Sequence, residues 1–251
     1  GNCCVGTANG LLRLNEHADS YEEYITSVGD RALSINNINT ISIDHKNRIW
    51  IGSVAGLNIW DPVQQRMHIP PMDDASGFRT AANYISSIVP GYDNFFWIGT
   101  WGGGLFKAWS TDDQIEQVKI SYVADFNGLI TAGRDHLFAL DGNRVSTFNI
   151  NTEKVELIRN LKQHIGNMNF ASICISAGDV LWLGAKNQLL KYSILEDSIE
   201  VIQMPIHEDF IVTGLIEDNV GMIWGSSNKT IFKFDPLGKE FKFFPVPEKI
   251  P

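Results

Sequence analysis

A short aromatic motif recurs along the sequence at long intervals, and this recurrence constrains the fold more than any other feature. Trp50-Ile51-Gly52 returns intact as Trp97-Ile98-Gly99, and each copy leads through a glycine-containing turn into another apolar run. Weaker copies are Cys4-Val5-Gly6, Gly128-Leu129-Ile130, Val180-Leu181-Trp182 and Gly221-Met222-Ile223-Trp224. Such internal similarity indicates that one supersecondary unit is used several times.

The spacing of the copies points to one class of repeat protein. Their anchor residues are expected at positions 4, 50, 97, 130, 182 and 224, on average 44 residues apart. A period of about 40 to 50 residues is typical of the blades of a β-propeller.

The residues inside each copy have the pattern of strands. In the second copy, apolar and β-branched runs occupy residues 39–43, 48–53, 56–60 and 66–69, and Asp, Asn and Gly separate them. No window keeps apolar residues at helical spacing with caps at both ends. We therefore predict an all-β fold, a β-propeller of four-stranded antiparallel blades with about six repeats.

The organisation of the whole chain follows from these copies. Residues 1–251 are expected to form a single propeller domain, because no repeat boundary is wider than a loop. The first copy lacks an innermost strand, and propellers avoid open sheet edges by sharing a blade between their chain ends. We expect the chain to be part of a seven-bladed ring in a longer polypeptide; a six-bladed ring that closes imperfectly is the alternative.

At these residues the sequence resembles a known repeat. The segment Asp93-Asn-Phe-Phe-Trp-Ile-Gly-Thr-Trp-Gly-Gly-Gly-Leu105 is similar to the two-component regulator propeller repeat. The resemblance implies a periplasmic sensor region of a Bacteroidetes-type hybrid two-component system, which responds to oligosaccharides and passes the signal to a histidine kinase elsewhere in the parent chain. The copy at Ile130 departs from the pattern because it lacks tryptophan, and the last copy reads Trp224-Gly-Ser-Ser227.

Composition and charge exclude several partner classes. The net charge of −9 and the pI near 5.1 argue against a nucleic-acid partner, because no basic surface is available to neutralise phosphates. No run approaches the roughly 18 to 20 apolar residues of a membrane span, so no membrane contact is expected within this segment. The three cysteines have no C-x-x-C spacing and indicate neither a disulfide framework nor a zinc site.

Local catalytic and metal-binding motifs are missing from the sequence. The six histidines are isolated, without an H-E-x-x-H motif, and no G-x-S-x-G nucleophile elbow occurs. Gly102-Gly103-Gly104 is interpreted as a hairpin turn, because no Lys-Ser/Thr pair follows it as in a phosphate-binding loop. We therefore expect no catalytic residues, no metal site and no cofactor.

Residues that vary between the copies are better candidates for a site than those that repeat. The recurring Trp50, Trp97, Trp182 and Trp224 are interpreted as packing between adjacent sheets. Trp101 instead occupies a hairpin position where the other copies have smaller or polar residues, so it is the best single candidate for ligand contact. The loops that lead into the innermost strands add tentative ligand-binding residues, whose amide, guanidinium and aromatic groups suit carbohydrate; these are Asn37, Asn39, Arg79, Asn83, Tyr84, Asn167 and Asn169.

Three functional hypotheses follow. The first is a non-enzymatic, extracytoplasmic sensor propeller with an oligosaccharide ligand, as the resemblance implies. The second is a protein-interaction scaffold, with the propeller faces forming a homodimer while sensing occurs elsewhere. The third is a propeller lyase or hydrolase, whose site would be assembled from several blades.

Overall fold

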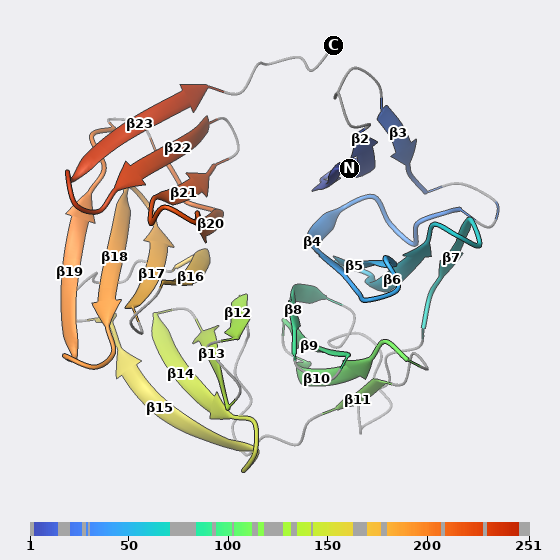
Figure 1. Ribbon diagram of the computed structural model, residues 1–251, viewed down its shortest axis with the longest axis horizontal. Helices are drawn as coiled ribbons and strands as arrows, with labels where there is room; N and C mark the ends of the chain where they lie inside the picture. The colour runs from blue at the N-terminus through green and yellow to red at the C-terminus, as the bar shows by residue number, and fades with distance from the viewer. Residues whose placement is uncertain are drawn as a thin grey trace. The chain divides into compact units, whose positions relative to one another are not determined.

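The chain folds into β-sheets that follow one another along the sequence (Figure 1). The computed structural model describes residues 3–14, 21–26, 29, 31–70, 84–91, 94–101, 103–111, 115–117, 128–131, 135–141, 143–162, 170–176, 180–206, 209–227 and 230–245. All named elements within these ranges are β-strands. Within the same ranges, no helix has the length and apolar character needed to cross a membrane.

The first three sheets comprise the strands up to Gln117. Sheet one contains β1 (Cys3–Thr7), β2 (Gly10–Leu14) and β3 (Tyr21–Tyr24). Sheet two contains β4 (Ile38–Ile43), β5 (Ile49–Ser53), β6 (Gly56–Asp61) and β7 (Arg66–His68). Sheet three contains β8 (Ile85–Pro90), β9 (Phe95–Thr100), β10 (Gly104–Trp109) and β11 (Ile115–Gln117).

Three further sheets have four strands each. Sheet four contains β12 (Gly128–Thr131), β13 (His136–Asp141), β14 (Arg144–Asn149) and β15 (Lys154–Asn160). Sheet five contains β16 (Ser172–Ser176), β17 (Val180–Ala185), β18 (Gln188–Ser193) and β19 (Ser198–Gln203). Sheet six contains β20 (Gly214–Glu217), β21 (Ile223–Ser226), β22 (Thr230–Asp235) and β23 (Glu240–Pro245).

Neighbouring strands of every sheet are consecutive in the chain, which is the organisation of propeller blades. The predicted all-β propeller fold is thus confirmed, including an incomplete first repeat of three described strands. Two compact units divide the chain: Gly1–His136 with Phe148–Val155, and Leu137–Thr147 with Glu156–Pro251. The single domain over 1–251 and the seven-bladed ring stay predictions.

Sheet four corrects the predicted register of one repeat. Ile130 was expected on the second strand of its sheet, at the position of the tryptophans, but it lies on the first strand, β12. Phe138, the third residue of β13, corresponds to Trp97 and Trp182, each the third residue of its second strand. With 138 as the anchor, the intervals range from 41 residues (97 to 138) to 47 (50 to 97).

The glycine of the Trp-Ile-Gly motif is required by the contact between successive sheets. A Cβ added to Gly52 would lie 2.5 Å from the Ile85 Cγ2 atom of the next sheet. The same relationship holds for Gly6 with Ile38 of sheet two and for Gly184 with Val212, which precedes β20, each at 2.6 Å. Backbone φ is not the reason at these positions; the next sheet, together with Thr40 beside Gly52 and Ser172 beside Gly184 in the same sheet, occupies the space where a side chain would lie.

The residue after that glycine closes the hairpin. Thr7, Ser53 and Thr100 each donate a side-chain hydroxyl to the carbonyl of the glycine that opens the following strand, at 2.8 to 2.9 Å. Those glycines, Gly10, Gly56 and Gly104, have φ values of 126°, 116° and 85°, a region in which a Cβ is strained. The sequence Gly-Thr/Ser followed by a glycine thus encodes a specific turn.

Two of the recurring tryptophans, Trp50 and Trp182, pack between sheets, as predicted. Trp50, Trp97 and Trp182 are at most 2% exposed, whereas Trp224 of sheet six is half-buried. One face of sheet two, with Trp50, Leu57 and Ile59, forms a continuous apolar cluster with sheet three. Sheets five and six form an equivalent cluster around Trp182 and Phe232. This burial accounts for the apolar positions that repeat in the sequence.

The first strands of sheets two and three, β4 and β8, each carry a bulge at their beginning. In β4 the register against β5 shifts between Ile38 and Thr40, so Asn39 is the extra residue. In β8 the register against β9 shifts between Ile85 and Ser87. Because a bulge redirects the side chain of the extra residue, these two positions differ from a regular strand.

Candidate functional site

The best-supported candidate site is an exposed aromatic pair at one end of sheet three. Trp101 follows the last residue of β9, and Tyr84 precedes the first residue of β8. Their ring centroids are 6.0 Å apart with an interplanar angle of 54°. Trp101 is 50% exposed and Tyr84 is 40% exposed. The structure thus brings together two of the predicted site residues and leaves both rings accessible to solvent.

The backbone fixes this pair in place. The Trp101 N–H donates to the Tyr84 carbonyl at 2.8 Å, which continues the β8–β9 ladder beyond its last strand residues. In the following hairpin, Gly104 adopts a positive φ and accepts a hydrogen bond from the Thr100 hydroxyl. Both aromatic residues are therefore anchored at the end of a rigid sheet and do not depend on a loop alone for their position.

Asn39 and Asn37 differ in what they contact. The Asn39 side chain donates from Nδ2 to the Ile85 carbonyl at 2.8 Å, the residue directly after Tyr84. Asn37 is exposed, and its side chain has no hydrogen bond among the described residues. Asn39 was predicted as a ligand contact, and the structure shows that its amide nitrogen is already engaged by sheet three.

The remaining predicted site residues lie outside the described part of the chain. These are Arg79, Asn83, Asn167 and Asn169. Their predicted role in ligand binding therefore stays a prediction.

A buried carboxylate network, not recognised as such in the sequence, lies at the turn between β4 and β5. Asp44 Oδ1 accepts the backbone N–H groups of Lys46 and Arg48, both at 2.9 Å. Its Oδ2 accepts Arg48 Nε at 2.7 Å and Trp50 Nε1 at 3.0 Å. Burial alone would raise the pKa of Asp44, but the hydrogen bonds from Trp50 and Arg48 outweigh it and lower that pKa. This carboxylate orients the core tryptophan, so its role is structural.

The same arrangement recurs in sheet six. Asp218 accepts Trp224 Nε1 at 2.7 Å and the backbone N–H of Met222 at 2.9 Å, and the bond from Trp224 is the main cause of its lowered pKa. In both sheets the aspartate precedes the tryptophan by six residues, a spacing that could have identified the network in the sequence.

Arg48 and its neighbours also tie sheet two to sheet three at the end remote from Trp101. Arg48 Nη2 donates to the Ser110 carbonyl. Lys46 Nζ donates to the Thr111 carbonyl at 3.1 Å, and the Ser110 hydroxyl lies 3.1 Å from His45 Nδ1. These contacts fasten the two sheets at one end, while Asn39 bonds them at the other end.

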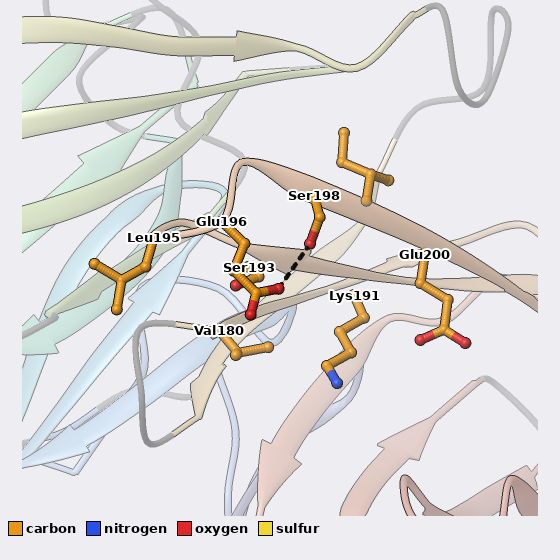
Figure 2. A pocket seen from close by; sticks show the side chains of 8 residues that line it. Val180, Lys191, Ser193, Leu195, Glu196, Ser198 and Glu200 are labelled. Carbon is orange, nitrogen blue, oxygen red and sulfur yellow. Dashed lines mark hydrogen bonds between the residues drawn. The ribbon is translucent and has the colours of Figure 1, made fainter.

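A separate pocket of about 490 Å³ lies on sheet five (Figure 2). Lys191 and Glu200, which are paired across β18 and β19, line it together with Ser193, Leu195 and Glu196. The Ser198 hydroxyl donates to Glu196 at 3.3 Å, and Glu200 pairs with Lys239 at 2.6 Å. Lys191 lies over the Trp182 ring at 5.9 Å, as Lys233 lies over Trp224 at 5.4 Å. The Lys191 side chain that lines the pocket therefore has an equivalent in sheet six, where Lys233 lies over Trp224.

Metal-ligating and nucleophilic side chains do not gather in the described residues. Within them, no group of three or more His, Cys, Asp and Glu side chains is close enough to hold a metal ion. Cys174 is buried on the innermost strand β16, where burial, reinforced by the charge of Glu217, raises the pKa of its thiol to about 12. A thiol in this state is a poor nucleophile.

Comparison with solved structures identifies the fold. The extracellular domain of a protein from B. thetaiotaomicron described as a hybrid two-component system superposes with a TM-score of 0.75 at 20% identity, over 99% of this chain and 35% of that one. A second such domain from the same organism gives 0.73 at 19% identity, over 94% and 32%. Virginiamycin B lyase from Staphylococcus aureus gives 0.76 at 11% identity, over 99% and 82%.

The chain spans about a third of the length of the two extracellular domains it matches. No protein of curated function matches the sequence. The model of the two-component regulator propeller family matches residues 32–55, which include β4, β5 and the first part of the following turn. This segment contains the hydrogen bond from Trp50 to Asp44 and Gly52, which packs against Ile85 of the next sheet. Residues 32–55 therefore match the two-component regulator propeller repeat, the repeat that the sequence resembles.

Proposed function

We propose that this chain is a non-enzymatic, extracytoplasmic sensor propeller of a two-component signalling protein, and that it binds an oligosaccharide. The propeller repeat and the fold shared with extracellular domains of two-component proteins support the sensor assignment. The same comparisons support a location outside the cytoplasm, since those solved domains are extracellular.

The observation that carries the ligand proposal is the exposed pair Tyr84 and Trp101. Two large aromatic side chains, 40% and 50% exposed, are costly to leave in water unless a partner covers them. Their rings are tilted by 54° and present two differently oriented faces. Aromatic faces with hydroxyl and amide groups nearby suit sugar rings, which are apolar on their faces and polar at their edges.

Calorimetric titration with a panel of plant and host oligosaccharides tests this proposal. At least one member of the panel is expected to bind the chain. Trp101→Ala and Tyr84→Ala are each expected to weaken that binding about tenfold or more, the effect of losing a central aromatic contact. Leu237→Ala removes another exposed apolar side chain, 95% accessible and in the β22–β23 turn, and is expected to bind as the wild type does.

The other outcomes separate the competing functions. Binding that is unchanged in both aromatic variants would place the ligand elsewhere. No binding by any panel member, together with a homodimer that persists in Trp101→Ala, would favour a protein-interaction scaffold instead. A metal ion retained by the purified protein, or turnover of a sugar or lactone, would favour the lyase or hydrolase class that shares this fold.

A further inference from the structure

The segment leading into β8 is held from two sides by two different sheets. The Tyr84 carbonyl accepts the Trp101 N–H of its own sheet at 2.8 Å. The carbonyl of the next residue, Ile85, accepts Asn39 Nδ2 of sheet two at 2.8 Å. Successive carbonyls of an extended chain point to opposite sides, so the two bonds clamp one short stretch of backbone between them.

Asn39 reaches this carbonyl because of its position in a bulge. The extra residue of a bulge is unpaired in its own ladder, so its side chain can be redirected out of the regular pattern. Strand β8 lies at one edge of its sheet, and among the described residues the side that faces away from β9 has no β-strand partner within that sheet. The Asn39 amide therefore supplies a donor to an edge carbonyl that a strand would otherwise pair.

From this geometry we propose that Asn39 is a positioning residue, which sets the Tyr84–Trp101 pair from the neighbouring sheet and couples ligand contact at that pair to sheet two. This inference rests on the proposed function, in which the pair contacts the ligand. Asn39 acts on the pair through the backbone of Ile85 and Tyr84 and does not itself need to touch the ligand.

The sheet contact supports this coupling. Gly52 of sheet two lies against Ile85, where a Cβ would approach the Ile85 Cγ2 atom to 2.5 Å. Ile85 is fully buried, whereas Tyr84, one residue earlier, is exposed. The same residue thus receives a side-chain packing contact and a backbone hydrogen bond from sheet two. A displacement of sheet two where it contacts Ile85 is therefore expected to move Tyr84, the preceding residue, and with it the aromatic pair.

The test needs no ligand and uses fluorine NMR of the chain labelled with 5-fluorotryptophan. The chain has seven tryptophans, and the Trp101 resonance is identified by its loss in Trp101→Phe. Asn39→Asp removes the amide donor and keeps the shape of the side chain. Asn37→Asp adds the same charge two residues away, to an exposed side chain that does not bond Ile85, and is the matched control.

At pH 7, Asn39→Asp is expected to shift or broaden the Trp101 resonance more than Asn37→Asp does. The resonances of the other six tryptophans are expected to stay unchanged. A protonated aspartate can donate an O–H to the Ile85 carbonyl. The resonance of Asn39→Asp is therefore expected to return toward the wild-type position near pH 3.5, below the ordinary carboxyl pKa of about 3.9. Wild-type spectra at both pH values control for other effects of acid.

Two results would overturn the proposal: a Trp101 resonance in Asn39→Asp that matches the wild type at pH 7, or one that moves equally in Asn37→Asp. Asn39→Ser, whose side chain is too short to reach Ile85, repeats the test if Asn39→Asp does not fold. A positive NMR result without binding of any panel oligosaccharide would refute the proposed ligand and leave the positioning role intact.

Discussion

Trp50 donates its buried indole N–H to Asp44 at 3.0 Å, whereas Trp97, at the equivalent place in the next sheet, has glycine where Asp44 would stand. Gly91 leaves room for Phe95, whose ring would lie 2.2 Å from a Cβ added to that glycine. Phe95 packs edge-on against Trp97 at 5.5 Å. One sheet therefore holds its tryptophan by a charge-assisted hydrogen bond, and the next holds it by ring packing.

This difference predicts unequal costs for removing the two indole nitrogens. Trp50→Phe loses a hydrogen bond to a carboxylate, worth roughly 2 kcal/mol. Trp97 Nε1 is buried without a hydrogen-bond partner in the described part of the chain, so Trp97→Phe removes an unpaired donor. Denaturant unfolding should show Trp50→Phe less stable than Trp97→Phe by about 2 kcal/mol. Equal losses would mean that the Trp50–Asp44 bond contributes nothing to stability.

Replacing the Asp44 carboxylate is expected to destabilise the fold strongly. Asp44→Asn presents an amide group to donors that surround the buried carboxylate and removes the negative charge that pairs with Arg48 Nε, at a cost of about 3 kcal/mol. Urea unfolding measures this loss. Asp61→Asn is the control and is expected to change stability much less, because Asp61 is half-buried at the end of β6 and its Oδ1 accepts only two backbone N–H groups.

The same carboxylate gives the fold a defined pH dependence. The pKa of Asp44 is lowered in the folded chain, so its stabilisation is complete above the unfolded pKa of about 3.9 and is lost as the pH falls through the folded value. Wild-type stability should therefore decrease below about pH 4 more steeply than that of Asp44→Asn. Parallel pH profiles of the two proteins would contradict this assignment.

The glycine of Trp-Ile-Gly is expected to tolerate no side chain. In Gly52→Ala the new methyl would approach Ile85 Cγ2 to 2.5 Å and Thr40 Cγ2 to 2.6 Å, and such overpacking costs about 2 kcal/mol. Ile85→Ala removes one of the two obstructing groups. In a double-mutant cycle, Gly52→Ala should cost less in the Ile85→Ala background than in the wild type. Strict additivity would show that the two residues are not in contact.

Cys174 is expected to be inert in the folded protein. With a thiol pKa of about 12, only about 1 in 10,000 molecules carries the reactive thiolate at pH 8. In a Cys3→Ala/Cys4→Ala background, Ellman's reagent should react with Cys174 slowly in buffer and completely in denaturant. Fast reaction of the folded protein would show that β16 opens readily.

The strands and their core could be predicted because each repeat gives the same evidence. Residues 39–43 and 56–60 were predicted as strands and lie in β4 and β6. The prediction failed where the repeat motif is weakest: sheet four has Phe138 in place of tryptophan, and Ile130 lies on the first strand of that sheet instead of the second. Apolar runs alone do not distinguish the first strand of a sheet from the second.

The sequence pointed to Trp101 and Tyr84 as separate residues of the candidate site, but it did not predict how they contact each other. Trp101 departs from the repeat, and in the structure it is exposed and lies beside Tyr84, seventeen positions earlier in the sequence. The contact of Asn39 with Ile85, across 46 residues, depends on a bulge and on the packing of two sheets. Single-sequence patterns carry no information on such a long-range bond, and the predicted ligand contact of Asn39 stays a prediction.

The glycine contacts between sheets also bear on how such a chain can evolve. At three junctions the first sheet offers a bare glycine and the second offers a β-branched side chain, namely Gly6 with Ile38, Gly52 with Ile85, and Gly184 with Val212. Because the same kind of contact recurs, a sheet that is duplicated or exchanged can pack against its new neighbours in the same way. Selection can then change the exposed residues of each unit, such as Trp101, while the buried contacts between sheets stay the same.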